Sequence, residues 1–269
     1  MLINSLWFAF GTALLPVLFA SMPSAHSLPI KALAQQCGVS ARTITRHRNY
    51  IVAAALLIDG GFASIVAAMT SSHFCTAERQ YRMPVLYGNQ RTPTAQWTAT
   101  ASGCCILSRR GDGPYITHVT CGRIVDLGIK DANNMGAAMM PAAASTLLRY
   151  FAATNTRPQD FDAIFTGDLG EVGSALLREQ MAKEGVPLDN HQDCGCLLYD
   201  TQGQNVQAGG SGAGCSAAVL CCKILPMLAA GQLRRVLFMA TGALMSQTTF
   251  LQGESIPGIA HCVELGGAV

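Results

Sequence analysis

The sequence is poor in charge and has no cysteine motif typical of a metal site. Only 13% of its 269 residues are Asp, Glu, Lys or Arg, and the formal net charge is +2. So small a net charge gives no electrostatic reason to expect nucleic acid or an acidic partner. Of the eleven cysteines, no two have CxxC spacing, although Cys104-Cys105 and Cys221-Cys222 are adjacent pairs in apolar runs. Such cysteines usually pack as small hydrophobic residues, so we expect a reducing compartment and no metal.

Glycine and hydrophobic residues are abundant instead. Half of the residues are hydrophobic and 27 are glycine, which is typical of an α/β protein with a buried parallel sheet. The stretch from Gly209 to Ala243 predicts a glycine-rich turn, a long apolar helix and a strand buried on both faces. An offset of 171 residues aligns LAAGQLRRVLFMATGA with LIDGGFASIVAAMTSS, so Val236 falls on Ile65. We interpret this likeness as an internal duplication.

The remaining pattern alternates strands and helices. We expect strands at 64–69, 161–165 and 256–265, and helices at 135–153 and 173–184. Residues 96–108 and 115–125 look like a hairpin around the turn Arg109 to Gly113. This alternation, together with the duplication, predicts layered α/β halves.

The first 50 residues differ from the rest of the chain. No acidic residue occurs before Asp59, and the apolar run Leu6 to Ala20 is too short for a typical membrane span. Residues 30–48 resemble a helix-turn-helix, which would present Thr43, Thr45 and Arg46 to a major groove. DNA binding through this segment is one alternative function. No helical domain surrounds it, so we favour an N-terminal extension and no nucleic-acid partner.

Several distinctive stretches lie between about residue 50 and 265, among them GRIVDLGIKDANNMGAAMM, DAIFTGDLGEVGSALL, HQDCGCLLYD and AGGSGAGCSAAV. With these stretches the sequence resembles the stage V sporulation protein AD family. The resemblance implies a thiolase-like fold of two similar βαβαβαββ halves in an α/β/α/β/α arrangement. We expect a non-family extension at 1–49, disordered or misassigned, an incomplete first half at 50–145 and a second half at 146–269.

The resemblance also implies a function. It predicts a protein that binds dipicolinic acid, alone or as its calcium chelate, for uptake into the developing spore. Membrane proteins of the stage V sporulation A operon would be partners, and the location would be cytoplasmic, peripheral to the spore inner membrane. Full-length relatives would form homodimers, and no cofactor is implied.

The catalytic residues of thiolase-like enzymes are not intact. The family's GACST-like motif should fall near residue 44, where this chain has Ile44-Thr45, so we expect a frameshifted or misassigned start. The positions of the enzymes' His and Asn motifs hold Thr166-Gly167-Asp168 and Gly210-Ser211-Gly212. Condensation needs a cysteine nucleophile and oxyanion donors, so we favour a binding protein over the alternative, an acyl-condensing acyltransferase.

A dianionic aromatic ligand needs hydrogen-bond donors and cationic groups. Hydroxyls and a histidine follow the first strand, a His–Asp pair is expected in a later loop, and a serine precedes the second helix. Capping of the next helix and a loop-ordering contact are the structural alternatives. The candidate ligand-binding residues are Ser71, Ser72, His73, Arg79, His191, Asp193 and Ser211. We expect Cys215 to be a buried small residue and not a nucleophile.

Overall fold

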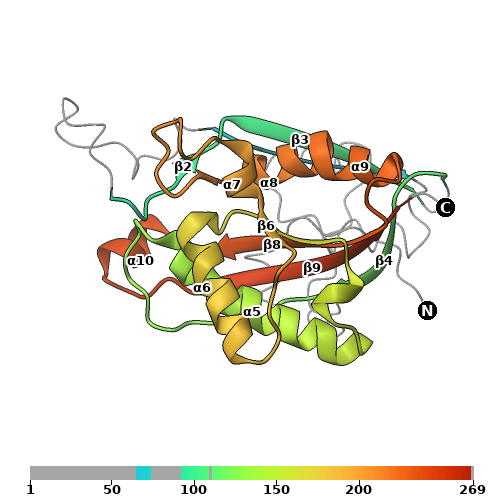
Figure 1. Ribbon diagram of the computed structural model, residues 1–269. Helices are drawn as coiled ribbons and strands as arrows, with labels where there is room; N and C mark the ends of the chain where they lie inside the picture. Colours follow the sequence, from blue (N-terminus) through green and yellow to red (C-terminus); the bar gives the residue numbers. More distant parts are fainter. Residues whose placement is uncertain (1–64, 74–91, 109–110, 268–269) are drawn as a thin grey trace, which may run out of the picture.

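The computed structural model describes residues 65–73, 92–108 and 111–267 (Figure 1). The predicted extension, the helix-turn-helix-like segment, the position near residue 44 and Arg79 lie outside these ranges. Within them, no helix combines the length and the apolarity that crossing a membrane requires.

A five-stranded mixed sheet forms the centre of the described structure. Its order is β4-β9-β8-β5-β6, with β5 parallel to β6 and β8, and β9 antiparallel to β8 and β4. The strands are β4 (Tyr115–Thr120), β5 (Ala163–Thr166), β6 (His191–Asp193), β8 (Arg235–Ala243) and β9 (Gly258–Gly266). The strands predicted at 161–165 and 256–265 are thus confirmed, with small shifts of their ends.

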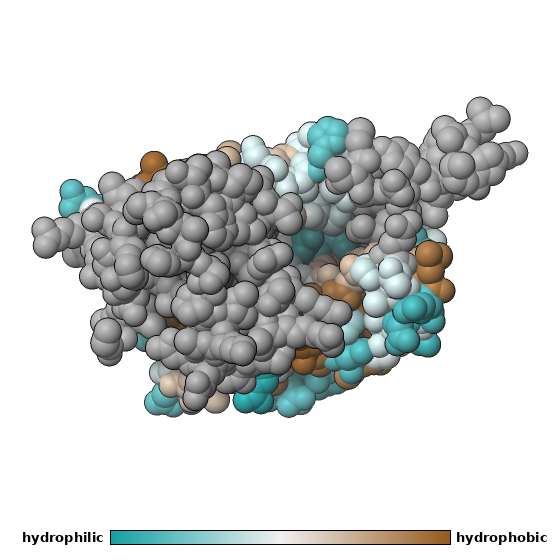
Figure 2. Space-filling model, turned by 180° about the vertical axis from the view of Figure 1, so that it is seen from behind, coloured by the Kyte–Doolittle hydropathy of each residue, from teal (hydrophilic) through white to brown (hydrophobic). Residues whose placement is uncertain are grey.

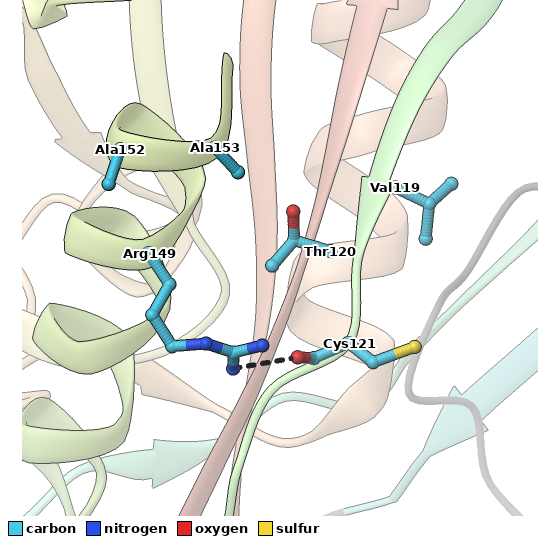
Figure 3. A pocket seen from close by; sticks show the side chains of 6 residues that line it. All are labelled: Val119, Thr120, Cys121, Arg149, Ala152 and Ala153. Atoms are coloured by element: carbon cyan, nitrogen blue, oxygen red, sulfur yellow. Dashed lines mark hydrogen bonds between the residues drawn. The ribbon is translucent and has the colours of Figure 1, made fainter. Parts of the chain in front are cut away.

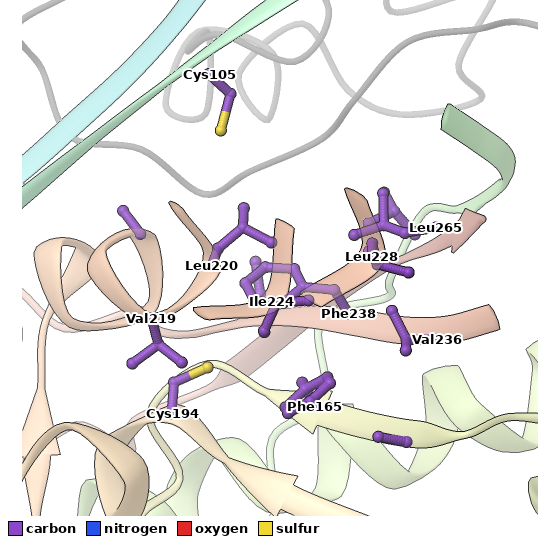
Figure 4. Packing of buried hydrophobic residues seen from close by; sticks show 14 of the residues in the cluster. Cys105, Phe165, Cys194, Val219, Leu220, Ile224, Leu228, Val236, Phe238 and Leu265 are labelled. Carbon is purple, nitrogen blue, oxygen red and sulfur yellow. The ribbon is translucent and has the colours of Figure 1, made fainter. Parts of the chain in front are cut away.

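Helices cover both faces of this sheet because alternate side chains of its central strands point to opposite faces. Ile164 and Leu237 pack with α5 (Met135–Thr154) and α6 (Gly170–Lys183). Phe165 and Phe238 pack on the other side, against α8 (Ala213–Val219), η5 (Leu220–Ile224) and α9 (Leu225–Ala229) (Figure 4). Burial on both faces, as predicted for 236–240, therefore follows from two helical layers.

Helix α5 has clear sequence signals at both ends. The side chain of Asn134 accepts a hydrogen bond from the main-chain N–H of Ala137 at 3.2 Å, which caps the first turn. Asn155 ends the helix in the left-handed conformation, with φ of 52°, which asparagine tolerates better than most residues. Small residues between these ends let the helix lie close to the sheet and to α6.

The order of elements from 115 to 266 is βαβαβαββ, formed by β4, α5, β5, α6, β6, the α8–α9 stretch, β8 and β9. This is the order that the family resemblance implies for one half. Four short elements complete it: η4 (Pro158–Asp160), α7 (Cys194–Leu198), β7 (Gly210–Ser211) and α10 (Gln247–Leu251). The boundary expected between residues 145 and 146 falls inside α5, and β4 lies in the same sheet as the later strands.

The predicted hairpin of 96–108 with 115–125 is wrong. Strand β3 (Ala101–Ser108) pairs antiparallel with β1 (Ile65–Ser72), whereas β4 pairs with β9. Short β2 (Trp97–Thr98) pairs with β7. Neighbouring position in the chain suggested a hairpin, but the inward side of β3 packs on α8, and β4 extends the other sheet. Long-range burial decides the partner of each strand.

The repeat seen in the sequence has a structural counterpart. The 171-residue offset places β1 on β8, and each of these strands pairs antiparallel over its length with a later strand, β3 or β9. The β1–β3 pair covers the α8–α9 layer from the side opposite the large sheet (Figure 1). The described residues thus contribute four successive layers, α/β/α/β.

Some large hydrophobic side chains remain exposed on this part of the chain. Seen from behind, hydrophobic surface lies between hydrophilic patches (Figure 2). The exposed residues are Met69, Ile106, Tyr115, Ile124, Leu127, Phe250 and Leu251.

A buried carboxylate joins the sheet to α5. Glu264 on β9 is 3% exposed and accepts hydrogen bonds from Arg235 Nε at 2.7 Å and from the hydroxyl of Tyr150. His118 Nδ1 lies 2.9 Å from the same carboxylate. Although burial raises the pKa of Glu264, these hydrogen bonds hold it below its ordinary value.

We predict that Glu264→Gln lowers the free energy of unfolding by about 2 kcal/mol near neutral pH, because Arg235 then faces an amide instead of a carboxylate. Since the folded-state pKa is lowered, the contribution is present above the ordinary pKa of 4.5 and is lost as pH falls through the folded value. Urea unfolding measures both effects. Glu179→Gln, which removes an exposed pair with Lys183, is the control and should cause no measurable change. Equal stability of the Glu264 variant and the parent would contradict the assignment.

Candidate functional site

Polar side chains collect where the parallel strands end. Thr166 ends β5, Asp193 ends β6, and Thr241 lies near the end of β8. Open α/β sheets place ligands at the carboxyl ends of their strands, so this edge is the candidate site.

Asp193 holds this edge together. It is 3% exposed, and its carboxylate accepts five hydrogen bonds from three segments. The donors are Thr166 Oγ1 at 2.6 Å and the main-chain N–H groups of Leu169, Gly170, Gly195 and Cys196 at 2.8 to 3.3 Å. Burial raises the pKa of Asp193, and the hydrogen bonds oppose that rise. With its acceptor capacity used internally, Asp193 orders the loops and is not placed to contact a ligand.

The direct His191–Asp193 pair expected from the sequence is wrong, because the hydroxyl of Thr166 lies between the two. Thr166 Oγ1 donates to Asp193 and lies 2.9 Å from His191 Nε2, so His191 donates its Nε2 proton to Thr166. The two residues share one face of β6 and pair with β5, which places both beside Thr166. Burial lowers the pKa of His191 to about 4, so the ring is neutral at neutral pH. The loop-ordering alternative describes this arrangement.

A second group of residues, which we call the strand-end cluster, consists of Ser72, Asp168, Ser211, Gly212 and Thr241, of which Gly212 contributes its main-chain N–H. Asp168 Oδ2 accepts from the N–H of Gly212 at 2.8 Å, and Oδ1 accepts from Thr241 Oγ1 at 2.8 Å. Gly212 has φ of 97°. A Cβ there would lie 2.9 Å from Ser72 Oγ, so only glycine suits this position.

The predicted serines Ser72 and Ser211 come together in this cluster on either side of Ala99. Ser72 Oγ donates to the carbonyl of Ala99 at 2.7 Å, and the N–H of Ala99 donates to the carbonyl of Ser211 at 2.9 Å. Ser72 Oγ also accepts from the N–H of Gly214 at 3.1 Å. Ser72 therefore caps α8, a helix far along the chain. The capping alternative supposed instead that it caps the helix that follows β1.

Two other candidates lie apart from the cluster's interior. Ser71 is exposed on β1 and, by alternation, points to the opposite face from Ser72. His73 is exposed just beyond the strand. Among the predicted residues that the structure describes, only Ser72 and Ser211 thus lie within the cluster.

The sequence analysis missed Gln96 and gave no role to Asp168 or Thr241. Gln96 Nε2 donates to the carbonyls of Asp168 at 2.7 Å and Gly210 at 2.9 Å, which ties β2 to the strand ends. The Thr-Gly at the end of β8 was visible as a strand terminus, but its partner Asp168 is 73 residues away. Only the fold brings these groups together.

The cysteines beside the cluster are poor nucleophiles. Cys215 and Cys194 are fully buried, and burial raises the pKa of each thiol, with nearby carboxylates raising it further. Burial likewise raises the pKa of Cys196. The thiolate is the reactive form, so these residues are suited to packing. The expectation that Cys215 is a buried small residue is confirmed.

A separate surface cavity of about 540 Å³, wide open to solvent, lies between β4 and the C-terminal half of α5 (Figure 3). Arg149 reaches across it and donates to the carbonyl of Cys121 at 3.1 Å. The lining residues are Val119, Thr120, Cys121, Arg149, Ala152 and Ala153. None of the residues predicted from the sequence lines this cavity.

A family model described as stage V sporulation protein AD matches residues 11–266. The match begins within the stretch that the sequence analysis treats as an extension. The stage V sporulation protein AD of Bacillus subtilis (strain 168) is 44% identical over 245 residues, which cover 90% of this chain and 70% of that protein.

Solved structures of condensing enzymes are also similar to the chain. A tetronic acid condensing enzyme is 16% identical, with a TM-score of 0.47 over 88% of this chain and 66% of that one. The 3-oxoacyl-(acyl carrier protein) synthase III of Pseudomonas aeruginosa PAO1 is 10% identical, with a TM-score of 0.48 over 81% of this chain and 63% of that one. The chain thus spans less than two thirds of the length of these two structures.

We predict that Asp193→Asn lowers the free energy of unfolding by about 2–4 kcal/mol, because an amide nitrogen would face main-chain N–H donors in a buried site. Thermal or urea unfolding measures the loss. Asp189→Asn, on the exposed loop just before β6, is the matched control and should leave stability unchanged. An Asp193→Asn variant as stable as the parent would contradict the role assigned to the Asp193 carboxylate.

We also predict that His191 makes the fold sensitive to acid. Its folded-state pKa is about 4 and its ordinary value 6.5. Between these two pH values the unfolded chain binds a proton on His191 that the folded chain does not bind. The free energy of unfolding therefore falls as pH drops through this window, by up to about 3 kcal/mol. His191→Gln should flatten that part of the profile, measured by urea unfolding from neutral pH to near pH 4. Parallel profiles for parent and variant would contradict the account.

Proposed function

The chain belongs to the stage V sporulation protein AD family, and we propose that it binds dipicolinic acid at the strand-end cluster without catalysing a reaction. Identity of 44% over 90% of the chain is the observation that carries this proposal. In this role the protein would act in the uptake of dipicolinic acid into the developing spore.

The chemistry of the cluster supports binding over condensation. Hydroxyls, main-chain N–H groups and a carboxylate meet there, and the adjacent Cys215 is buried as a thiol. Where condensing enzymes place their histidine motif, the chain has Thr166 and Asp168, whose hydrogen bonds are made within the protein. A carboxylate cannot donate to an oxyanion, so this arrangement does not suit an acyl-condensing reaction.

Charge favours the calcium chelate over the free acid as the ligand. Asp168 lies in the cluster, and Asp193 is buried behind it. Carboxylates at this strand edge would repel free dipicolinate, which is a dianion. Calcium prefers oxygen ligands and would be attracted to them. Asp168 is only half-buried, so solutes can reach its side chain, unlike that of Asp193. We therefore propose that Asp168 faces the calcium of the chelate.

The location and the partners belong to the same proposal. A carrier that delivers dipicolinic acid needs membrane proteins to move it, and the family resemblance implies those of the stage V sporulation A operon. A position in the cytoplasm beside the spore inner membrane would suit this role. Pairing of full-length copies into homodimers is part of the same expectation.

Equilibrium dialysis of dipicolinate against the 269-residue chain, with and without calcium, tests the proposal. We predict saturable binding that calcium strengthens. Asp168→Asn should weaken binding of the chelate by about tenfold, because one charge-assisted contact to calcium is lost. Arg149→Gln, in the separate cavity, is the matched control and should bind as the parent does.

Several outcomes would contradict the proposal. If neither the free acid nor the calcium chelate binds, the proposed function is wrong. If the Arg149 variant loses binding, the ligand binds in the cavity beside Arg149 and not at the strand-end cluster. Incubation with acyl-coenzyme A followed by mass spectrometry tests the condensing alternative. An acyl group on any cysteine would overturn the binding-only account.

A further inference from the structure

Two cysteines from distant parts of the chain bring their sulfur atoms into contact. Cys105 on β3 and Cys221 on η5 are separated by 3.4 Å between their Sγ atoms. Cys105 is buried and projects from its strand toward the helical layer (Figure 4). Cys221 is half-buried, so one partner is within reach of small solutes. Each belongs to one of the two adjacent cysteine pairs in the sequence, for which the proposed function has no use.

The backbone around the two sulfur atoms is held firmly. A Cβ on Gly103 would lie 2.7 Å from the carbonyl oxygen of Ala217, and one on Gly214 would lie 2.2 Å from that of Ala101. Strand β3 and helix α8 are therefore packed main chain against main chain. A disulfide has a sulfur–sulfur bond of about 2.05 Å, so closure requires the sulfurs to approach by about 1.4 Å.

The geometry selects Cys105 and Cys221 over their neighbours. Alternation along β3 turns Cys104 to the exposed face, away from the helix. Cys222 is exposed one position further along the helical stretch, so its side chain leaves the helix in another direction. A π-helical turn such as η5 is rare and often occurs at functional sites.

We propose that Cys105 and Cys221 are a reversible thiol–disulfide site, which a low-molecular-weight disulfide oxidises. The thiolate of Cys221 attacks one sulfur of that disulfide and releases one small thiolate, which takes up a proton. The thiol of Cys105 then loses its proton and attacks the Cys221 sulfur, releasing the second small thiol. The protein loses two protons and two electrons, and the small disulfide takes them up to become two thiols.

The state of the two thiols suits these roles. The contact between the two sulfur atoms lowers the pKa of Cys221 to about 7, against the effect of burial, and Cys221 Sγ also lies 3.6 Å from the carbonyl oxygen of Cys104. The same interaction, together with burial, raises the pKa of Cys105. Cys221 is the more exposed of the two, so it is the attacking sulfur and Cys105 is the resolving one.

Oxidation would join β3 to the helix that begins at the strand-end cluster. The bond closes a loop of more than a hundred residues, which restricts the unfolded chain strongly. Oxidised protein should therefore unfold at a higher temperature than reduced protein. This inference does not rest on dipicolinate binding.

The test uses the reduced 269-residue chain, incubated with oxidised glutathione, blocked by alkylation and mapped by mass spectrometry. We expect a peptide pair joined through Cys105 and Cys221, lighter by two hydrogen atoms and separated again by dithiothreitol. In Cys105→Ser, glutathione should remain attached to Cys221. In Cys221→Ser, the linked pair should be absent.

Cys104→Ser and Cys222→Ser are the matched controls and should form the bond as the parent does. Alkylation of both Cys105 and Cys221 after oxidation of the parent would overturn the proposal, as would a bond that forms through Cys104 or Cys222 instead. Melting of each reduced variant, with Cys105→Ala as a second form, verifies that the variants are folded when they are tested.

Discussion

The buried carboxylate of Asp193 accepts five hydrogen bonds, and the positions of the strand ends depend on it. Its donors belong to the end of β5, the start of α6 and the start of α7. A buried carboxylate without partners would be costly, so these main-chain groups must stay aligned with it. The same alignment sets Thr166 between Asp193 and His191, and it places Asp168 at the next turn.

From that fixed edge, contacts run to the other side of the helical layer. Asp168 holds the N–H of Gly212 and the hydroxyl of Thr241, while Ser72 from β1 caps α8 through Gly214. The first strand and the later sheet thus meet at one group of hydroxyl and amide donors beside the half-buried carboxylate of Asp168. We propose that this surface holds a chelated cation. The cysteine contact joins β3 to η5, further along the same strand and helical stretch.

The sequence predicted well the features that depend on local pattern and repetition. The repeat at an offset of 171 residues, the α5 helix and the buried β8 strand can each be recognised from the pattern of residues along the chain. It failed where a partner lies far along the chain. Proximity in the chain favoured a hairpin of β3 with β4, but β3 pairs with β1 and β4 pairs with β9. Spacing favoured a direct His191–Asp193 pair, but the hydroxyl of Thr166 lies between these two side chains. Hydrogen bonds of Asp168 to residues 44 and 73 positions away leave no local signal.

An experimental structure of the chain with calcium and dipicolinate bound would test the central claim most directly. The account predicts the chelate at the strand-end cluster, with its calcium beside Asp168 and its oxygen atoms near Ser72 and the N–H groups around Gly212. A ligand in the cavity beside Arg149, or a cluster that stays empty at saturating chelate, would contradict it.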